Sequence, residues 1–360
     1  MKRFALILPI FTFACASLIW AQTPSEFKGH DGLVFSVAFS NDGKSMATAS
    51  FDGTVKIWDY ANGKELQVLK GHTGPVYGVA FNNDGTIVAT GGQDKSIKIW
   101  DPKDGKMSKE LKGHADIVGA LVFSPDGKTL ASAGADKSVK IWDVAGAKEL
   151  KSFATHKESV YSVAFNKDGS QLVSCGNDGL IKIYDVKGLT EAKTFMVDLP
   201  KKIVEEKKEE KIEEKKDEKK DKKDKKDAKK AMGKKEEPKE LRDAFTVVAF
   251  TPDGKQVLSV GHDKFLRYWS IADGKETKKV GPTPDYIFGL ALSKDGKHVA
   301  TAGYGGSLRV YEVDSGKEVL NTHQKGWITY CVTFAPDGKS VITGHEKASK
   351  GIARVTAISK

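Results

Sequence analysis

Four sets of histidine, serine or threonine, and aspartate side chains recur in the first half of the 360-residue chain. The same residue types build a hydrolase triad, in which a histidine takes the proton of a hydroxyl nucleophile and an aspartate orients the ring. The sets follow one another every 42 residues. Catalysis needs one such set, whereas buried polar groups need partners in every repeat, so the repetition favours a structural role. The sets are His30, Thr48 and Asp52; His72, Thr90 and Asp94; His114, Ser132 and Asp136; and His156, Ser174 and Asp178.

The sequence has no motif that indicates a cysteine-bound metal, an attached haem or a phosphate site. The three cysteines, Cys15, Cys175 and Cys331, lie far apart, and the chain has no CxxC or CxxCH motif and no glycine-rich phosphate loop. We therefore expect no metal or other cofactor. Cys175 and Cys331 stand where other repeats have small residues, on different sides of the predicted ring, and we expect both to be free thiols.

The net charge of +10 does not indicate a nucleic-acid-binding domain. Residues 201–240 hold 18 Lys and 14 acidic residues, and Lys2 with Arg3 precede an apolar run. The rest of the chain carries 38 Lys and Arg against 34 Asp and Glu, which is close to balance. A folded basic surface is therefore not expected, and neither is binding to nucleic acid.

The 42-residue period extends over the whole chain apart from its start and one insertion. Within a unit, VFSVAF (34–39) alternates like a half-buried strand, NDGK (41–44) supplies a hairpin turn, and TVKIWD (54–59) and ELQVLK (65–70) supply further strands. The Asp-Gly turns at 253, 295 and 337 return to this period after the insertion. Seven units of four strands are the pattern of propeller blades.

The repeats resemble those of WD-repeat β-propellers. LKGH (69–72) followed by VYGVAFNNDGTIVATGGQDKSIKIWD (76–101) is close to a consensus unit of that family. The resemblance implies an all-β, seven-bladed propeller of four-stranded antiparallel blades. Each unit would begin with the outer strand of the preceding blade, so we expect residues 24–30 to pair with the last strand, near 352–359, and close the ring.

The resemblance also gives the repeated polar residues a role. In the family, the His, the Ser or Thr, the Asp and a Trp of one unit form a buried hydrogen-bonded network. The fourth members here are Trp58, Trp100, Trp142 and, in the fourth unit, Tyr184. The later units depart from the pattern: the fifth keeps Ser259, Asp263 and Trp269 without the His, and the sixth has Gly305 for Asp and Tyr311 for Trp. The seventh keeps His323 and Thr343 without the Asp or the Trp, and we expect blades five to seven to be the less rigid side.

Aromatic residues recur near the start of the inner strands, on the face where partners of this family usually bind. Large rings with polar tips are effective anchors for a peptide or protein. We interpret these residues as a candidate binding collar around the channel mouth; the alternative is that the rings only pack on neighbouring loops. The candidate residues are Phe35, Phe51, Tyr77, Tyr161, Tyr286, Phe288, Tyr304 and Tyr330.

Two segments lie outside the repeats. Residues 1–21 combine Lys2 and Arg3, an apolar run and a small residue at Ala21, which is typical of a secretory signal peptide cleaved before Gln22. A retained membrane anchor is the alternative, although Pro9 interrupts a run that is short for spanning a bilayer. Residues 201–240 are 32 charged residues out of 40, and we expect a disordered insertion that either screens or recruits at the collar face or is an inert loop.

We therefore divide the chain into a signal peptide (1–21), blades one to four with the closing strand (22–200), the charged insertion (201–240) and blades five to seven (241–360). We expect an exported protein, periplasmic, on the cell surface or secreted, and a monomer without stable membrane insertion once the signal is cleaved. Its expected function is a non-catalytic scaffold for a protein or peptide partner. The alternative is a propeller that holds a cofactor as an enzyme or electron-transfer protein.

Overall fold

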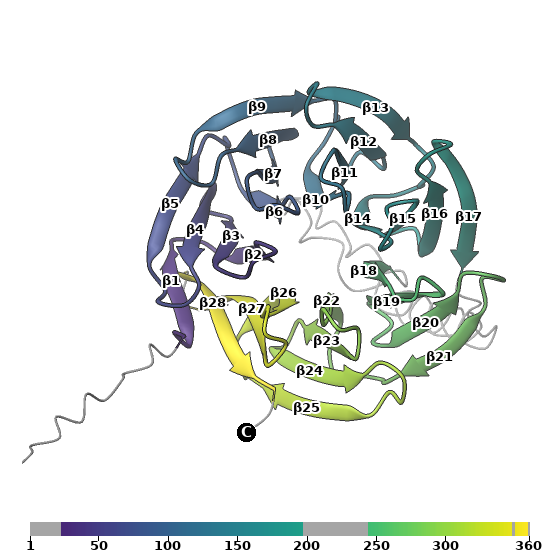
Figure 1. Cartoon of the computed structure of the whole chain (residues 1–360). Helices are drawn as coiled ribbons and strands as arrows, with labels where there is room; N and C mark the ends of the chain where they lie inside the picture. The colour runs from purple at the N-terminus through teal and green to yellow at the C-terminus, as the bar shows by residue number, and fades with distance from the viewer. Residues whose placement is uncertain (1–22, 197–243, 348–349, 359–360) are drawn as a thin grey trace, which may run out of the picture.

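Seven four-stranded sheets are arranged around a central axis, as the sequence predicts (Figure 1). The structure is a computed structural model that describes residues 23–196, 244–347 and 350–358. All regular elements in these ranges are strands, antiparallel within each sheet. The predicted signal peptide and charged insertion lie outside the described residues.

Blades one to four follow the chain in order from the inner to the outer strand. Blade one comprises β2 (Val34–Phe39), β3 (Ser45–Ser50), β4 (Thr54–Asp59) and β5 (Glu65–Lys70). Blade two comprises β6 (Val76–Phe81), β7 (Val88–Gly92), β8 (Ser96–Trp100) and β9 (Met107–Lys112). Blade three comprises β10 (Val118–Phe123), β11 (Thr129–Gly134), β12 (Val139–Asp143) and β13 (Lys148–Phe153). Blade four comprises β14 (Val160–Phe165), β15 (Gln171–Gly176), β16 (Leu180–Asp185) and β17 (Thr190–Met196).

Blades five and six repeat this order, and blade seven takes its outer strand from the start of the chain. Blade five comprises β18 (Phe245–Phe250), β19 (Gln256–Gly261), β20 (Leu266–Ser270) and β21 (Glu276–Val280). Blade six comprises β22 (Ile287–Leu292), β23 (His298–Gly303), β24 (Ser307–Glu312) and β25 (Glu318–His323). Blade seven comprises β26 (Ile328–Phe334), β27 (Ser340–Lys347), β28 (Lys350–Ala357) and β1 (Glu26–His30).

Pairing of β1 with β28 closes the ring, which confirms the expected closure. Glu26 lies opposite Arg354, and Phe27 lies opposite Ala353. Phe27 is buried and contacts the rings of Trp58 and Tyr60 in blade one, with centroids 5.7 and 5.9 Å away. The closing strand is therefore packed into the neighbouring blade as well as paired in its own, and β28 is covered by β1 instead of forming the edge of its sheet.

The hydrophobic core consists of seven clusters between blades rather than one central core. In the cluster between blades one and two, Ile57 and Leu69 from one blade pack against Val76, Val88 and Trp100 from the next. The same arrangement recurs at the other interfaces, including the one between blades seven and one, where Ile342 and Ala353 pack near Met46. Each blade thus buries its faces only against its two neighbours, as the 42-residue repeat predicts.

The hairpin between the first and second strand of a blade depends on its glycine. Gly43 has a φ of +72°, and Gly254 after the insertion has a φ of +67°, a conformation that residues with a Cβ rarely adopt. The Asp before each glycine accepts a backbone hydrogen bond two residues on, from Lys44 to Asp42 at 3.0 Å in blade one. The Asp-Gly pairs that mark the period in the sequence are therefore the turns that set the strand register.

Candidate functional site

The repeated His, Thr and Asp side chains meet in a buried hydrogen-bonded chain at the boundary between two blades. In the first copy, Trp58 Nε1 donates to Thr48 Oγ1 at 2.9 Å, and Thr48 Oγ1 lies 2.8 Å from His30 Nε2. His30 Nδ1 lies 2.7 Å from Asp52 Oδ2, which also accepts the backbone N–H of Asp31 at 3.0 Å. A carboxylate oxygen can only accept hydrogen bonds, so a neutral His30 ring in this hydrogen-bonded network carries its proton on Nδ1. His30 comes from β1, so the network ties blade seven to blade one.

The second, third and fourth copies tie the following pairs of blades in the same way. His72, His114 and His156 lie 2.7 Å from the hydroxyls of Thr90, Ser132 and Ser174. The ring Nδ1 atoms lie 2.8 to 3.0 Å from the paired carboxylate oxygens of Asp94, Asp136 and Asp178. Trp100 and Trp142 donate to the hydroxyls at 2.8 Å. The fourth copy ends on Tyr184, whose hydroxyl lies 3.1 Å from both Ser174 and Thr155.

The electrostatics of the networks keep the carboxylates ionised and do not favour nucleophilic chemistry. Burial opposes the charge on Asp52, but hydrogen bonds from His30 and Thr54 outweigh it and hold the pKa well below its usual range. Burial lowers the pKa of His72, although Asp94 opposes the shift. The hydroxyl of Thr48 is buried and already engaged by Trp58 and His30. These sets connect neighbouring blades through hydrogen bonds.

Blade five replaces the histidine-linked network with an ion pair inside the blade. Trp269 Nε1 still donates to Ser259 Oγ at 2.8 Å. Asp263 accepts a hydrogen bond from Arg267 Nε at 2.5 Å, and Arg267 also pairs with Glu276. Burial disfavours the guanidinium charge, but both carboxylates outweigh this cost and raise the pKa of Arg267. At the position that the tying histidine holds in the first four copies, the sequence has Leu241 before blade five.

In blade seven the expected His323 is not part of the network, which corrects the sequence-based assignment. His323 ends the outer strand β25 and is exposed. The buried histidine is His345 on β27, whose ring nitrogens lie 2.9 Å from Thr329 Oγ1 and 2.5 Å from Thr343 Oγ1. Position 345 aligns in register with Ser50 of blade one, so the 42-residue spacing alone does not find it.

Burial governs the ionisation of His345. It lowers the pKa of the ring to about 4, and the charge on Arg354 acts in the same direction. The Trp327 ring packs edge-on against the imidazole, with centroids 4.9 Å apart. This histidine is therefore held neutral inside its own blade and does not tie blade seven to blade six.

A second repeated ion pair was missed by the sequence analysis. A Lys or Arg on the third strand of each of blades one to six pairs with a Glu on the outer strand of the same blade. Lys98, for example, is 5% exposed, and its Nζ lies 2.6 Å from Glu110. The sequence carried the signal, because the basic residues keep the 42-residue period at Lys56, Lys98, Lys140 and Lys182. A buried charge needs a partner, so the outer-strand glutamates could have been found by the same reasoning.

The inner strand of every blade has a β-bulge near its start. The collar residues that lie on inner strands occupy this bulge. In blade one the register jumps from Val34 opposite Ser50 to Ser36 opposite Ala49, so Phe35 is the extra residue. The same jump makes Tyr77, Tyr161, Phe288 and Tyr330 the extra residues of blades two, four, six and seven. A bulge re-aims its side chain away from the regular pleat. The fold therefore gives each blade one inner-strand residue near the mouth that is excluded from the strand ladder.

Seven of the eight collar residues form a connected group, here called the aromatic arc. Phe35 contacts Phe51, Tyr77 and Tyr330, with ring centroids 5.7, 5.2 and 5.4 Å away. Phe288 continues the group to Tyr330 and Tyr304 at 5.5 and 5.8 Å. Tyr286 joins it through His262, which lies 5.2 Å from Tyr286 and 5.6 Å from Phe288. The seven residues of the arc belong to blades six, seven, one and two, and His262 of blade five contacts both Tyr286 and Phe288.

Blades three and four contribute no ring to the aromatic arc. Tyr161, in blade four, is 43% exposed and contacts no arc ring in the described part of the chain, while blade three has Gly119 at its bulge. Within the arc, Phe51 and Tyr304 are 39% and 45% exposed, and the other rings are partly exposed. The predicted collar is thus brought together over one side of the ring only. The alternative interpretation was that the rings only pack on their surroundings. It also holds in part, because the arc rings contact one another.

Both described cysteines are free, as expected. Cys175 is fully buried, and burial raises the pKa of its thiol. Burial likewise raises the pKa of Cys331 to about 12. A thiol that does not ionise near neutral pH is a poor nucleophile and a poor metal ligand.

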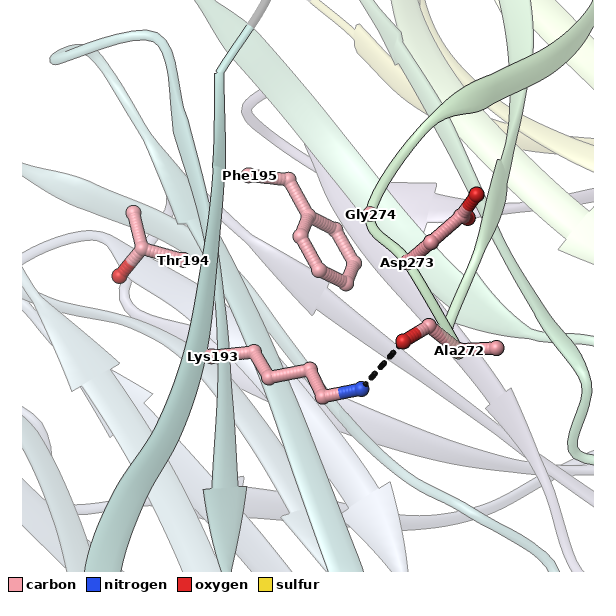
Figure 2. A pocket seen from close by; sticks show the side chains of 6 residues that line it. All are labelled: Lys193, Thr194, Phe195, Ala272, Asp273 and Gly274. Atoms are coloured by element: carbon pink, nitrogen blue, oxygen red, sulfur yellow. Dashed lines mark hydrogen bonds between the residues drawn. The ribbon is translucent and has the colours of Figure 1, made fainter.

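The blade edges contain shallow hollows rather than a deep cleft. One hollow of about 330 Å³ lies between β17 and the turn after β20. Figure 2 shows Lys193 reaching across it to the Ala272 carbonyl, with a Nζ to O distance of 2.9 Å, while the Phe195 ring lies beside Gly274. Lys109 and Lys278 make equivalent contacts to the carbonyls of Val144 and Val313 in the next blade, at 2.9 and 2.7 Å. At these edges a lysine of one blade therefore donates to backbone carbonyls of the next blade.

The described ranges also bear on metal sites and on membrane spans. No group of three or more His, Cys, Asp or Glu side chains there is arranged to hold a metal ion. Within the same ranges, no helix is long and apolar enough to cross a membrane. β17 ends and β18 begins at the same end of the inner strands as the aromatic arc.

Comparison with known proteins identifies six repeats. The model of the family described as "WD domain, G-beta repeat" matches residues 21–59, 63–101, 105–143, 147–185, 241–270 and 275–312. The chain is 59% identical over 34 residues to transducin beta-like protein 2 of Homo sapiens, which covers 9% of this chain and 8% of that protein.

Two further relatives match over similarly short stretches. The chain is 46% identical over 44 residues to ribosome biogenesis protein erb1 of Botryotinia fuckeliana, covering 12% of this chain and 6% of that protein. It is 43% identical over 54 residues to vegetative incompatibility protein HET-E-1 of Podospora anserina, covering 15% of this chain and 4% of that protein. The alignments therefore span about one repeat and a small part of each relative.

Proposed function

Because this chain belongs to the WD-repeat family of β-propellers, we propose that it is an exported, non-catalytic scaffold whose protein or peptide partner binds at the aromatic arc. Propellers of this family generally bind protein partners. The observation that carries the proposal is that four bulged inner-strand residues, Phe35, Tyr77, Phe288 and Tyr330, are all aromatic and lie in one connected group. Side chains removed from the strand ladder are available to a ligand at little cost to the fold.

The character of the arc supports a protein or peptide as the ligand. Aromatic rings provide large apolar contact area with few rotatable bonds, and four tyrosines add hydroxyl groups for hydrogen bonds. Phe51 and Tyr304 are the most exposed rings of the arc. A partner seated here would bridge several blades and would leave the buried histidine networks untouched.

The test uses a photoreactive residue at two positions and compares the proteins that are captured. The full chain carries the photoreactive amino acid at Tyr77 or at Phe288, with Leu150 on the exposed outer strand β13 as the control position. We expect both arc positions to capture the same protein from a native extract, and the Leu150 position not to capture it. Phe35→Ala in the same protein should remove the capture. Capture that is equal at Leu150, or unchanged in Phe35→Ala, would contradict the proposal.

Export is a separate part of the proposal and rests on the residues before Gln22. A short cationic start followed by an apolar run is typical of a secretory signal peptide. N-terminal sequencing of the mature protein should find Gln22 at the start and the protein outside the cytoplasm. An intact Met1 on a cytoplasmic protein would contradict export without affecting the arc. A featureless visible spectrum and metal analysis would likewise separate the scaffold from a cofactor-holding propeller.

A further inference from the structure

Blade seven holds a further member of the repeated basic residues on the third strands, here called the basic row. The members in blades one to six each pair with a glutamate on the outer strand of the same blade. Arg354 on β28 lies opposite Thr343, as Arg309 lies opposite Thr301 in blade six. The chain therefore places a guanidinium in blade seven at the position where the other six blades hold a cation paired with a carboxylate.

Within the described residues, the outer strand of blade seven does not pair a carboxylate with Arg354. Thr23 stands one 42-residue repeat before Glu65, the glutamate of blade one. Glu26 lies opposite Arg354 in the β1–β28 ladder, but its carboxylate pairs with Lys28, with Oε2 and Nζ 2.7 Å apart. In the part of the chain that the structure describes, Arg354 consequently lacks the counter-ion that the other members of the basic row have.

The guanidinium of Arg354 is directed towards the boundary with blade six. Its Nη1 donates to Gln324 Oε1 at 2.8 Å, and its carbon Cζ lies 5.6 Å from the centre of the Trp327 ring. All three residues are partly exposed. A guanidinium has several N–H donors, and a neutral amide oxygen engages one of them without compensating the charge. Donors and charge therefore remain for a ligand that reaches this surface.

The loop that carries Gln324 and Trp327 adjoins the aromatic arc. The backbone N–H of Gln324 donates at 3.0 Å to the carbonyl of Gly306, two residues after Tyr304. The same loop leads directly into β26, whose bulge holds Tyr330. A partner seated on the blade-six and blade-seven part of the arc would therefore also meet this loop.

We infer that Arg354, with the Trp327 ring beside it, binds the carboxylate of a glutamate or aspartate side chain of the peptide partner. The inference rests on the proposed function and deepens it, because it gives the partner an acidic residue next to the arc. A carboxylate is what the outer strand supplies to Arg309 in blade six, and it matches a guanidinium in a two-point hydrogen-bonded geometry. The contact with the Trp327 ring limits the freedom of the arginine side chain before the ligand arrives.

The experiment titrates the full chain with end-blocked peptides, Gly-Ala-X-Ala-Gly, in which X is glutamate, glutamine, lysine or phosphoserine, and follows binding by ligand-observed NMR. We expect the glutamate peptide to bind about fivefold more tightly than the glutamine and lysine peptides, because of these three only it brings a carboxylate. Arg354→Gln should remove that preference. Equal binding of the glutamine peptide, absence of binding by all four peptides, binding of the phosphoserine peptide alone, or an unchanged preference in Arg354→Gln would overturn the inference.

Arg309→Gln is the matched control. Arg309 holds the same position of the basic row in blade six, but Glu318 already engages its guanidinium at 2.6 Å. This variant should keep the preference for the glutamate peptide. Loss of the preference in Arg309→Gln as well would indicate a general attraction of anions to the surface, against the inference.

The indole of Trp327 reports where the peptide binds. We expect the glutamate peptide to shift the Nε1–H resonance of Trp327, which is assigned with Trp327→Phe. The Nε1–H resonances of Trp58 and Trp100, which donate to buried hydroxyls, should not move. A titration that leaves the Trp327 resonance in place would contradict binding beside Arg354.

The internal alternative is an ion pair between Arg354 and Glu26 across the ladder. If the two side chains do not pair, the shifts of melting temperature caused by Arg354→Gln and Glu26→Gln should add in the double variant. A shift in the double variant that is clearly smaller than this sum would show an internal ion pair and would overturn the inference.

Failure of this inference and failure of the proposed function are seen in different experiments. An unchanged peptide preference in Arg354→Gln contradicts the carboxylate site alone. Unchanged partner capture in Phe35→Ala contradicts binding at the arc and leaves the peptide titration as it is.

Discussion

Among the residues that the structure describes, a histidine ties four of the seven blade interfaces. The ties join blades seven to one, one to two, two to three and three to four, each through a histidine that ends one blade and an aspartate in the next. At the other three interfaces the histidine position holds Leu241, Thr283 or Lys325. The comparison teaches that the repeated residues hold one part of the ring together. Four of the seven arc residues, Tyr286, Phe288, Tyr304 and Tyr330, belong to blades six and seven.

The largest effect is expected from cutting a tie. Asp136→Asn should lower the free energy of unfolding by about 3 kcal/mol, because the buried imidazole of His114 and the N–H of Ala115 lose a charged acceptor. Asp263→Asn, in blade five, should cost less than half as much, since Arg267 keeps Glu276. Urea unfolding of both variants measures the difference. Equal losses would contradict the distinction between tied and untied blades.

The pH dependence of stability should single out blade seven. The pKa of His345 is lowered to about 4 from an ordinary value near 6.5, so between these values the unfolded chain binds more protons than the folded one. Stability from this group is therefore present above pH 6.5 and is lost as pH falls towards 4, by about 2 kcal/mol between pH 7.5 and pH 5.

His345→Gln should flatten this part of the pH profile measured by urea midpoints. Some dependence remains, because burial also lowers the pKa of His72. The carboxylates act at lower pH: the depressed pKa of Asp136 means that its contribution is present above about pH 4 and is lost below it. A profile between pH 5 and 7.5 that is identical in His345→Gln would show that the ring is not held neutral by the fold.

A smaller effect is expected within the tied blades, at the one tie that lacks a tryptophan. Tyr184→Phe removes the hydroxyl that lies 3.1 Å from Ser174 and Thr155 and should cost about 1 kcal/mol. His156 still engages Ser174, so the tie itself remains. A loss as large as that of Asp136→Asn would mean that the aromatic member, rather than the histidine and aspartate, carries the tie.

The smallest effect concerns the lysines that reach across blade edges. Lys193→Met removes two contacts to carbonyls of blade five, at 2.5 and 2.9 Å, and should cost roughly 0.5 kcal/mol because the side chain is exposed. Lys151→Met is the control, since Lys151 has the same strand position but lies over the Phe153 ring of its own blade. Equal changes in the two melting temperatures would remove any role for Lys193 at the untied interface.

Period and turn chemistry were sufficient to predict the fold. The 42-residue spacing gave the seven blades, and the unpaired first strand with the unpaired last strand gave the closure that β1 and β28 show. The ties of blades one to four were likewise predictable, because each needs four residue types at fixed positions.

The parts of the structure that the sequence did not predict depend on contacts between residues that do not follow the 42-residue period. His345 contacts the Thr343 hydroxyl from within β27, and the Asp285 side chain occupies the space beside Gly305, so neither keeps the period. The collar was predicted from the positions of the aromatic residues around the channel mouth, whereas the ring contacts depend on which neighbours are also aromatic, and Gly119 interrupts them. The spacing predicts the position of a residue on its strand, but not which side chains it contacts in the folded protein.

Hydrogen exchange of the captured partner complex tests the central claim most directly. With the partner bound, we expect slower amide exchange in peptides covering β2, β22 and β26, where the bulged rings Phe35, Phe288 and Tyr330 lie, and no change in β10 or in the outer strands β9 and β13. Protection confined to the outer strands or to blades three and four, with β22 and β26 unchanged, would contradict binding at the aromatic arc.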